Sequence, residues 1–259
     1  MILTMYRLLL LIASSFVICE SAYVDSFKKC SMKDDECMRE FYQSLILSLG
    51  DNGAPEIGVN KIDPMELQNE SVSVLGILNM TLIDGFITGI KSCAIKSLVN
   101  DFDKGRATLQ TYCEHLTIQG HYIVDLADSI AQITSFIHST HGEGQGKVVI
   151  DKINVHIEFP FHFVNHNNDV HFKLHNDVMY SFNILGKAVF ESDSLVMGNE
   201  EGGKAIIKYL NDNWRVILES FGRVFFDKVV EIVKSFSNKF FDNVPVKNFI
   251  KEDLSSYVK

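Results

Sequence analysis

The stretch KAIIKYLNDNWRVILESFGRVFFDKVVEIVKSFSNKFFD, from Lys204 to Asp242, decides how the rest of the chain has to fold. Its apolar residues recur at steps of three or four, the repeat of a helix that buries one face. They are Ile207, Leu210, Trp214, Ile217, Phe221, Phe225, Val229, Ile232, Phe236 and Phe240. As one helix the stretch would be about 55 Å long at 1.5 Å per residue. We therefore predict that it runs along the axis of an elongated molecule.

Cap-type residues interrupt the stretch and a proline follows it. Asn211, Asp212 and Asn213 can divide it into a short helix and a long one, and Pro245 marks its end. Two interpretations of its Phe-rich face stay open. The face is either part of an ordinary packed core or, in part, the lining of a cavity that accepts a lipid.

The first residues have the layout of a secretory signal peptide. Arg7 precedes an apolar run from Leu8 to Ile18, and small or polar residues continue to about Ser21. The run is too short for a membrane-spanning helix. We predict that residues 1–21 are removed on export and that residues 22–259 form a single extracellular domain. The net charge of −9 argues against nucleic acid or an anionic membrane as a partner.

Four of the five cysteines remain after residue 21, and an even number in an oxidising compartment predicts two disulfides. Four cysteines allow three pairings. We favour Cys30–Cys37, which closes the short loop SMKDDE, and Cys93–Cys113, which a turn at Asp103 would place opposite each other on paired strands. The alternative for Cys93 and Cys113 is two buried thiols on neighbouring strands.

The first half of the chain changes from a helical pattern to alternation. Residues 34–49 predict a short amphipathic helix, and the Gly- and Pro-rich residues 52–67 predict an extended connector. HGEGQG, residues 141–146, predicts a glycine turn. A phosphate-binding loop is not favoured, because the spacing of the glycines does not fit one. Asn69 and Asn79 begin acceptor sequences for N-glycosylation. Four strand-like runs are Glu66–Ile83, Phe86–Val99, Arg106–Ile118 and Tyr122–Ile137.

A long hairpin is predicted between Ile153 and Ile184. Apolar residues alternate with polar ones on both sides of VNHNND, which has the composition of a turn. Pairing Phe163 with Val170 brings the two apolar sets to one face. The other pairs in this register are Phe161–Phe172, Phe159–Leu174 and Val155–Val178. Strands of this length favour a long curved sheet wrapped along a long helix.

Histidines and carboxylates gather on the other face of this hairpin. The same register predicts the pairs His162–His171, Glu158–His175 and His156–Asp177. Histidine is a common zinc ligand, but a zinc site needs three or four ligands that converge on one ion, and a flat sheet surface spreads them apart. We interpret them as solvated surface pairs, with a zinc site or a pH response as the second interpretation.

Motifs of catalysis are not found in the sequence. It contains no G-x-S-x-G, H-E-x-x-H, C-x-x-C or glycine-rich dinucleotide motif. We expect no catalytic activity, no cofactor and no bound metal. The high number of phenylalanine residues instead indicates a protein that encloses a ligand in its interior.

Several segments, in their order and spacing, resemble one known family. They are CSMKDDEC (30–37), GAPEIGVNKIDPMEL (53–67), LTIQGHY (116–122), HGEGQG (141–146) and LNDNWRVILESFGRVFFDKVVEIVKSFSNKFFDNVP (210–245). The chain resembles the insect takeout and haemolymph juvenile hormone binding protein family over nearly all of its length after the signal peptide. Two features depart from the family pattern. Asn60 and Lys61 stand where the family often has prolines, and Cys93 and Cys113 do not match the second disulfide of the dedicated hormone carriers. This favours a takeout-like member.

The resemblance implies an α+β tubular lipid-binding fold, in which a strongly curved antiparallel β-sheet wraps a long C-terminal helix around a hydrophobic channel. It also implies carriage of a juvenile hormone, another terpenoid or a fatty acid in haemolymph or another extracellular fluid. The aromatic residues assigned to the interior are the candidate ligand contacts. They are Phe159, Phe161, Phe163, Phe172, Tyr180, Phe182, Trp214, Phe221 and Phe225.

Tyr180 is the inward residue of the return strand with a polar tip, suited to orienting a carbonyl, epoxide or carboxylate. We expect a monomer without stable membrane insertion, whose partner is a hydrophobic small molecule. The alternative is a secreted interaction or signalling protein of the same fold, with a protein partner still to be identified and a vestigial cavity.

Overall fold

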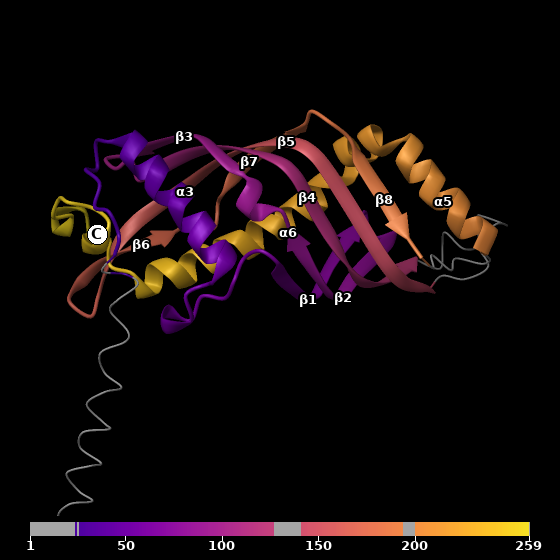
Figure 1. Ribbon diagram of the computed structural model, residues 1–259, viewed down its shortest axis with the longest axis horizontal. Coiled ribbons are helices and arrows are strands. Elements are labelled where there is room, and N and C mark those ends of the chain that lie inside the picture. Colours follow the sequence, from indigo (N-terminus) through magenta and orange to yellow (C-terminus); the bar gives the residue numbers. More distant parts are fainter. Residues whose placement is uncertain (1–23, 25, 127–140, 194–199, 259) are drawn as a thin grey trace, which may run out of the picture.

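The computed structural model describes residue 24 and residues 26–126, 141–193 and 200–258. The predicted signal peptide, residues 1–21, lies outside the described residues. The molecule is elongated, and a curled sheet wraps one side of a long helix (Figure 1). This confirms the predicted α+β architecture.

Two very long antiparallel strands form the spine of the sheet. Strand β4 spans Arg106–Leu126 and β5 spans His141–His166. They are paired from Arg106↔Pro160 at one end to Asp125↔His141 at the other. Every other described strand pairs with one of these two or, in the case of β1, with a neighbour of β4.

Shorter strands line both edges of this spine, and the described strands together form one eight-stranded sheet. On the β4 edge lie β3 (Ala94–Asp101) and β2 (Leu78–Thr88), and β1 (Met65–Val74) is the outer neighbour of β2. The β5 edge pairs in succession with β6 (Asp169–Leu174), β7 (Met179–Ile184) and β8 (Ala188–Ser192).

The helices follow the predicted pattern. Helix α5 spans Glu200–Asp212 and α6 spans Trp214–Asn243, so the long stretch is divided at Asn213 as its cap-type residues predict. Helix α6 alone is about 45 Å long at 1.5 Å per residue. It runs along the sheet for much of the length of the molecule (Figure 1). The described part of the chain also contains short 3-10 turns, η1 (Pro55–Ile57), η2 (Ile90–Ser92), η3 (Val246–Asn248) and η4 (Ser255–Tyr257).

Helix α3 (Asp35–Asp51) covers the free edge of β3. Gln43 accepts a hydrogen bond from the backbone N–H of Ile95 at 2.7 Å and donates one to the carbonyl of Cys93 at 3.1 Å. Asp35 accepts one from the backbone N–H of Asn100 at 3.0 Å. These side chains satisfy backbone groups that an edge strand would otherwise leave unpaired.

Both expected disulfides are present. Cys30–Cys37 joins the segment before α3 to its first turn, and Cys30 also forms a parallel bridge with Ile250 near the C-terminal end. Cys93–Cys113 connects the residue before β3 to β4, next to the register that continues as Ala94↔Tyr112. The turn between β3 and β4 follows Asp101, as predicted from the residues around Asp103.

The prediction of a turn at HGEGQG is wrong, because residues 141–146 begin strand β5. Its glycines fall at every second position and share the inner face, while His141, Glu143 and Gln145 are exposed on the outer face. A Cβ on Gly146 would lie 2.8 Å from the ring of Tyr122. The glycines therefore make room for that ring on a strongly curved strand.

The four predicted strand runs differ from the observed strands at their ends. The first run is two strands, because the chain turns at residues 75–77. Leu75 and Gly76 have φ of 55° and 65° there, and the backbone N–H of Ile77 donates to the carbonyl of Val74. The second is interrupted at Gly89 by η2. The third and fourth are continuous through Gly120 as β4, up to Leu126, and the remaining residues to Ile137 lie outside the described part.

The predicted hairpin register is wrong by two residues. Phe163 is opposite Phe172 and Phe161 is opposite Leu174, because the turn contains only Asn167 and Asn168, both with positive φ. A shift of two residues keeps the same side chains on the same face. The return strand is also interrupted after Leu174, and β7 then pairs Val155 with Phe182 instead of Val178.

Candidate functional site

The candidate site is the space between α6 and the concave face of the sheet. Buried apolar residues form two separate clusters along it. The larger cluster surrounds the C-terminal end of α6 and includes Phe161, Phe240 and Phe249. The smaller one lies around the Cys93–Cys113 disulfide and includes Ile153 and Leu218. Apolar side chains between and around them are half-buried.

Three of the predicted ligand contacts belong to a packed aromatic cluster at the first end. Phe161, Phe163 and Phe172 are 2–3% exposed. The ring of Phe172 lies 4.7 Å from that of Phe161 and 4.8 Å from that of Phe163, measured between centroids. Phe102 contacts all three rings. Rings that fill each other's space in this way form a solid core, so this end of the interior is closed.

Five other predicted contacts remain partly accessible. Phe159, Tyr180, Phe182, Trp214 and Phe225 are half-buried in the structure. Phe182 and Trp214 pack against the smaller cluster, whereas Phe159 packs against the larger one. Tyr180 and Phe182 of the sheet face residues 223–227, in the middle of α6, whereas Trp214 is at the start of that helix.

The inward face of α6 is displaced by one residue from the predicted stripe near its middle. Phe221 is 36% exposed, whereas Leu218 and Gly222 are buried. Phe226, which the sequence analysis did not select, stacks on Phe182 with centroids 3.8 Å apart. A Cβ on Gly222 would lie 3.3 Å from the Phe182 ring, so this glycine lets the ring approach the helix. In a run such as FGRVFFDKVV, periodicity does not decide which Phe faces inward.

The hydroxyl of Tyr180 is bound by the helix. It donates to Asp227 at 2.6 Å and lies 3.0 Å from the carbonyl oxygen of Arg223. The Arg223 guanidinium also lies 5.6 Å from the ring centroid. Burial and, to a lesser extent, the Asp227 carboxylate raise the pKa of Tyr180 above its ordinary value. Tyr180 therefore ties β7 to α6, and its hydroxyl is already engaged by these groups.

A groove of about 710 Å³ opens beside this interior, between α6 and the outer edge of β1. We call it the β1–α6 groove. Its lining residues are Asn52, Pro55, Val59, Asn60, Lys61, Pro64, Met65, Glu66, Glu70, Lys228, Glu231, Ile232, Ser235, Phe236 and Lys239. Its volume is within the range of small-molecule sites. Ile232 and Phe236 belong both to the groove and to the set packed against the larger cluster.

Comparison with known proteins agrees with this geometry. A family model for haemolymph juvenile hormone binding protein (JHBP) matches residues 8–251. The chain belongs to the JHBP family. The crystal structure of Epiphyas postvittana Takeout 1 matches 87% of this chain and 100% of that chain, with 21% identity and a TM-score of 0.73. That likeness shows the shared fold of a curled sheet around a long helix.

The crystal structure of lipopolysaccharide binding protein matches 79% of this JHBP-family chain and 38% of that chain, with 8% identity and a TM-score of 0.39. The search of curated proteins gave no match.

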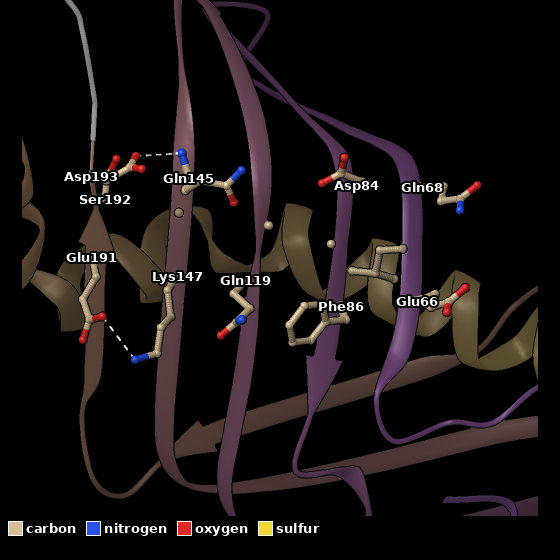
Figure 2. A pocket seen from close by; sticks show the side chains of 14 residues that line it. Glu66, Gln68, Asp84, Phe86, Gln119, Gln145, Lys147, Glu191, Ser192 and Asp193 are labelled. Carbon is tan, nitrogen blue, oxygen red and sulfur yellow. Dashed lines mark hydrogen bonds and ion pairs between the residues drawn. The ribbon is translucent and has the colours of Figure 1, made fainter. Parts of the chain in front are cut away.

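A second depression of about 720 Å³ lies on the outer face of the sheet, away from α6 (Figure 2). A row of paired residues, Glu66, Phe86, Gln119, Lys147 and Glu191, crosses β1, β2, β4, β5 and β8 there. Lys147 and Glu191 form an ion pair at 3.1 Å. Its lining mixes charged and amide groups with Leu67 and Phe86, and it does not border the space between the sheet and α6.

The predicted histidine pairs on the hairpin are wrong. His162 is opposite Lys173, Glu158 is opposite Met179 and His156 is opposite Ser181. His171 is 4% exposed, and its Nδ1 lies 2.8 Å from the carbonyl oxygen of Phe241 because the end of α6 covers it. Among the residues that the structure describes, no group of three or more His, Cys, Asp or Glu is arranged to hold a metal ion.

The described helices include none that is long and apolar enough to cross a membrane. The two sequon asparagines of this JHBP-family chain, Asn69 and Asn79, are exposed on β1 and β2.

Proposed function

We propose that the protein is a secreted carrier that holds one lipophilic small molecule between the curved sheet and α6. The observation that carries this proposal is the middle of the interior, where aromatic side chains of the sheet and the helix stay half-buried between two packed clusters. Transfer of apolar ligand surface into such a space is favourable by about 25 cal/mol per Å². A terpenoid such as a juvenile hormone, or a fatty acid, is elongated, as are the helix and the sheet between which we place it.

The comparisons support the same proposal. The family model is named for binding juvenile hormone, and that property is proposed for this chain on the basis of its membership. Export after removal of residues 1–21 fits the two disulfides, which form and persist in oxidising compartments. Asn69 and Asn79 are exposed and accessible to glycosylation in such a compartment. We propose that the mature chain, residues 22–259, is a monomeric domain of extracellular fluid, without enzymatic activity.

The ligand contacts that we propose are the half-buried aromatic residues. Phe159, Phe182, Trp214 and Phe225 remain from the predicted set, and Phe226 is added. Phe161, Phe163 and Phe172 close the end of the space, and Phe221 lies on the accessible side of the helix. Tyr180 stabilises the wall through Asp227.

A pair of variants on α6 tests this proposal with a matched control. Phe226→Ser removes an inward ring that stacks on Phe182, whereas Phe221→Ser removes an exposed ring five residues earlier on the same helix. Binding of a fluorescent fatty acid and of a fluorescent terpenoid is titrated in both proteins, with folding checked by circular dichroism. We expect at least tenfold weaker binding for folded Phe226→Ser and unchanged binding for Phe221→Ser. Equal binding by both would place the ligand elsewhere.

One observation favours the alternative of an interaction or signalling protein with a vestigial cavity. The Phe182 and Phe226 rings meet across the interior at 3.8 Å, which fills space that a ligand would need. Native mass spectrometry of protein purified from a secreting cell separates the two functions. A co-purified lipid supports the carrier. Protein that contains no lipid and takes up none from a terpenoid and fatty-acid mixture supports the alternative.

A further inference from the structure

The two long sides of α6 are attached to the sheet very differently. On the β6–β7 side, Asn238 accepts from the backbone of Leu174 at 3.2 Å and Asp242 pairs with Lys173 at 2.8 Å. Tyr180 adds its bond to Asp227. On the β1 side, within the described part of the chain, Lys228 with Glu70 at 2.8 Å is the polar side-chain contact between the two elements. The β1–α6 groove lies along this weakly attached side.

The walls of the groove are apolar toward the interior. Met65 and Val59 are buried members of the larger cluster, and Ile232 and Phe236 pack against it. Ile232 also follows Phe225 and Val229 at helical spacing, so the apolar surface continues from the groove along α6 toward the half-buried middle. A ligand tail entering here would stay in contact with apolar side chains along that path.

The polar rim of the groove carries three lysines, Lys61, Lys228 and Lys239. Lys228 is neutralised locally by Glu70 at 2.8 Å and Glu231 at 3.2 Å, and its hydrogen bond with Glu70 raises its pKa. Lys61 and Lys239 are exposed and form no ion pair among the described residues. Of the acidic lining residues, Glu66 is left without such a pair as well.

The two unpaired lysines are at the connector end of the groove. The side chain of Lys239 lies against Gly58. A Cβ added to Gly58 would be 3.3 Å from Cε and 3.8 Å from Nζ of Lys239. Gly58 has φ of 68°, so the connector turns there and brings Lys61 to the same lining. Among the described residues, two lysines without an ion pair therefore stand at an opening whose inner wall is apolar, in a chain with net charge −9.

We propose that the β1–α6 groove is the mouth of the interior and holds the acidic head of the ligand. The ligand is then an amphipathic carboxylic acid, with its carboxylate near Lys61 and Lys239 and its hydrocarbon tail between α6 and the sheet. The inference rests on the proposed carrier function and adds the chemical class of its ligand. A neutral ester of the same tail would occupy the interior but lose the attraction of the two ammonium groups.

The test compares dansyl-undecanoic acid with its methyl ester as fluorescent probes at neutral pH and low salt. The wild-type protein is expected to bind the acid about fivefold more tightly than the ester, as partly exposed charge pairs allow. Lys61→Gln combined with Lys239→Gln should remove this preference and leave ester binding unchanged. Lys33→Gln combined with Lys187→Gln changes the net charge equally at exposed positions outside the groove, and should keep the preference.

The outcomes separate the mouth from the carrier function. Equal binding of acid and ester by the wild type, or a preference that persists in the Lys61 and Lys239 variant, overturns the head site while the carrier stands. Loss of preference in the Lys33 and Lys187 variant would trace it to overall charge and also overturns the site. If the wild type binds neither probe, the proposed function fails and the inference fails with it.

Discussion

The side chain of Tyr180 shows how one polar group fixes the wall of the interior. Its hydroxyl donates to Asp227 of α6 and lies close to the backbone carbonyl of Arg223. Tyr180→Phe keeps the ring and removes this bond, so we expect the free energy of unfolding to fall by about 1 kcal/mol. Urea denaturation followed by circular dichroism measures it.

Tyr112→Phe is the matched control for this change. Its hydroxyl bonds Glu114 on the same strand, so it links no separate elements. We expect a smaller shift of the urea midpoint than for Tyr180→Phe. Equal shifts would mean that the bond between β7 and α6 adds nothing to stability.

Glu252 links residues 31 and 32, before α3, to the segment after α6. It accepts hydrogen bonds from Ser31 Oγ at 2.5 Å and from the backbone N–H of Met32 at 2.9 Å. The bond from Ser31, and secondarily that from Met32, hold the pKa of Glu252 below its ordinary value of 4.5. A lowered folded-state pKa gives stability that is present above the unfolded-state pKa and is lost as pH falls through the folded-state pKa.

We therefore expect wild-type stability to decrease below about pH 4.5, partly through Glu252. Thermal melts of the wild type and Glu252→Gln between pH 7 and pH 3 measure this contribution. The variant should be less stable at pH 7, and the difference should shrink toward pH 3. A difference that stays constant with pH would exclude ionisation of Glu252 as its cause.

The sequence alone predicted many of the residues that face the interior, but it did not predict the orientation of each aromatic ring. The alternation of Phe159, Phe161 and Phe163 placed all three on the inner face correctly. Whether an inward ring closes the core or lines a cavity depends on neighbours distant in sequence, such as Phe102 and Phe172 around Phe161. Those neighbours cannot be read from the alternation of one strand.

At the scale of the element, glycines set the curvature of the sheet. Gly85 and Gly120 are paired on β2 and β4, and a Cβ on Gly120 would lie 2.1 Å from the carbonyl oxygen of Asp84 and 2.5 Å from the Cα of Gly85. These contacts are with backbone, which cannot rotate away. The two strands can approach this closely because neither residue has a side chain.

We expect Gly120→Ala to destabilise the protein by roughly 2 kcal/mol or more, through displacement of β2 from β4. Gly76→Asn is the control, because a Cβ at Gly76 meets nothing within 4 Å and asparagine tolerates its positive φ. Chemical denaturation of both variants checks the expectation. A Gly120→Ala protein as stable as the control would show that the curl does not need this close approach.

The same glycines explain why the strands were harder to predict than the helices. Gly120 and HGEGQG have the composition of turns, yet both lie inside long strands. The inner face of these strands is so crowded that residues without a side chain are required there. The division of the long stretch at Asn213 was predicted from its cap-type residues, although the Asn213 side chain bonds the carbonyl of Tyr209 in α5 and does not cap α6. The hairpin register failed because its turn uses two asparagines in the left-handed region, and composition does not show which residues adopt it.

For the molecule as a whole, the two regions of the interior should respond differently to truncation. Phe161 lies in the closed aromatic cluster, whereas Phe226 lies beside the half-buried middle. We expect Phe161→Ala to lower the free energy of unfolding by about 3–5 kcal/mol. Phe226→Ala should lower it less and should weaken probe binding more.

Denaturation and probe titration on the same two variants measure both quantities. If the protein is a carrier, Phe161→Ala should show the larger loss of stability and Phe226→Ala the larger loss of affinity for the probe. Parallel losses would mean that the interior is one continuous core without a separate ligand region.

The pairing of β4 with β5 also constrains the order in which the chain can fold. The two strands come together across sequence separations that grow steadily, from Asp125↔His141 at the glycine-rich end to Arg106↔Pro160 at the other. Closing the shortest loop costs the least chain entropy. Pairing of β4 with β5 should therefore start at the glycine-rich end and extend pair by pair toward Arg106 and Pro160. Strands β6, β7 and β8 attach to β5 alone within the sheet. Folding should therefore be slow, on the order of milliseconds to seconds. The glycines that allow the sheet to curl would also lie where its formation begins.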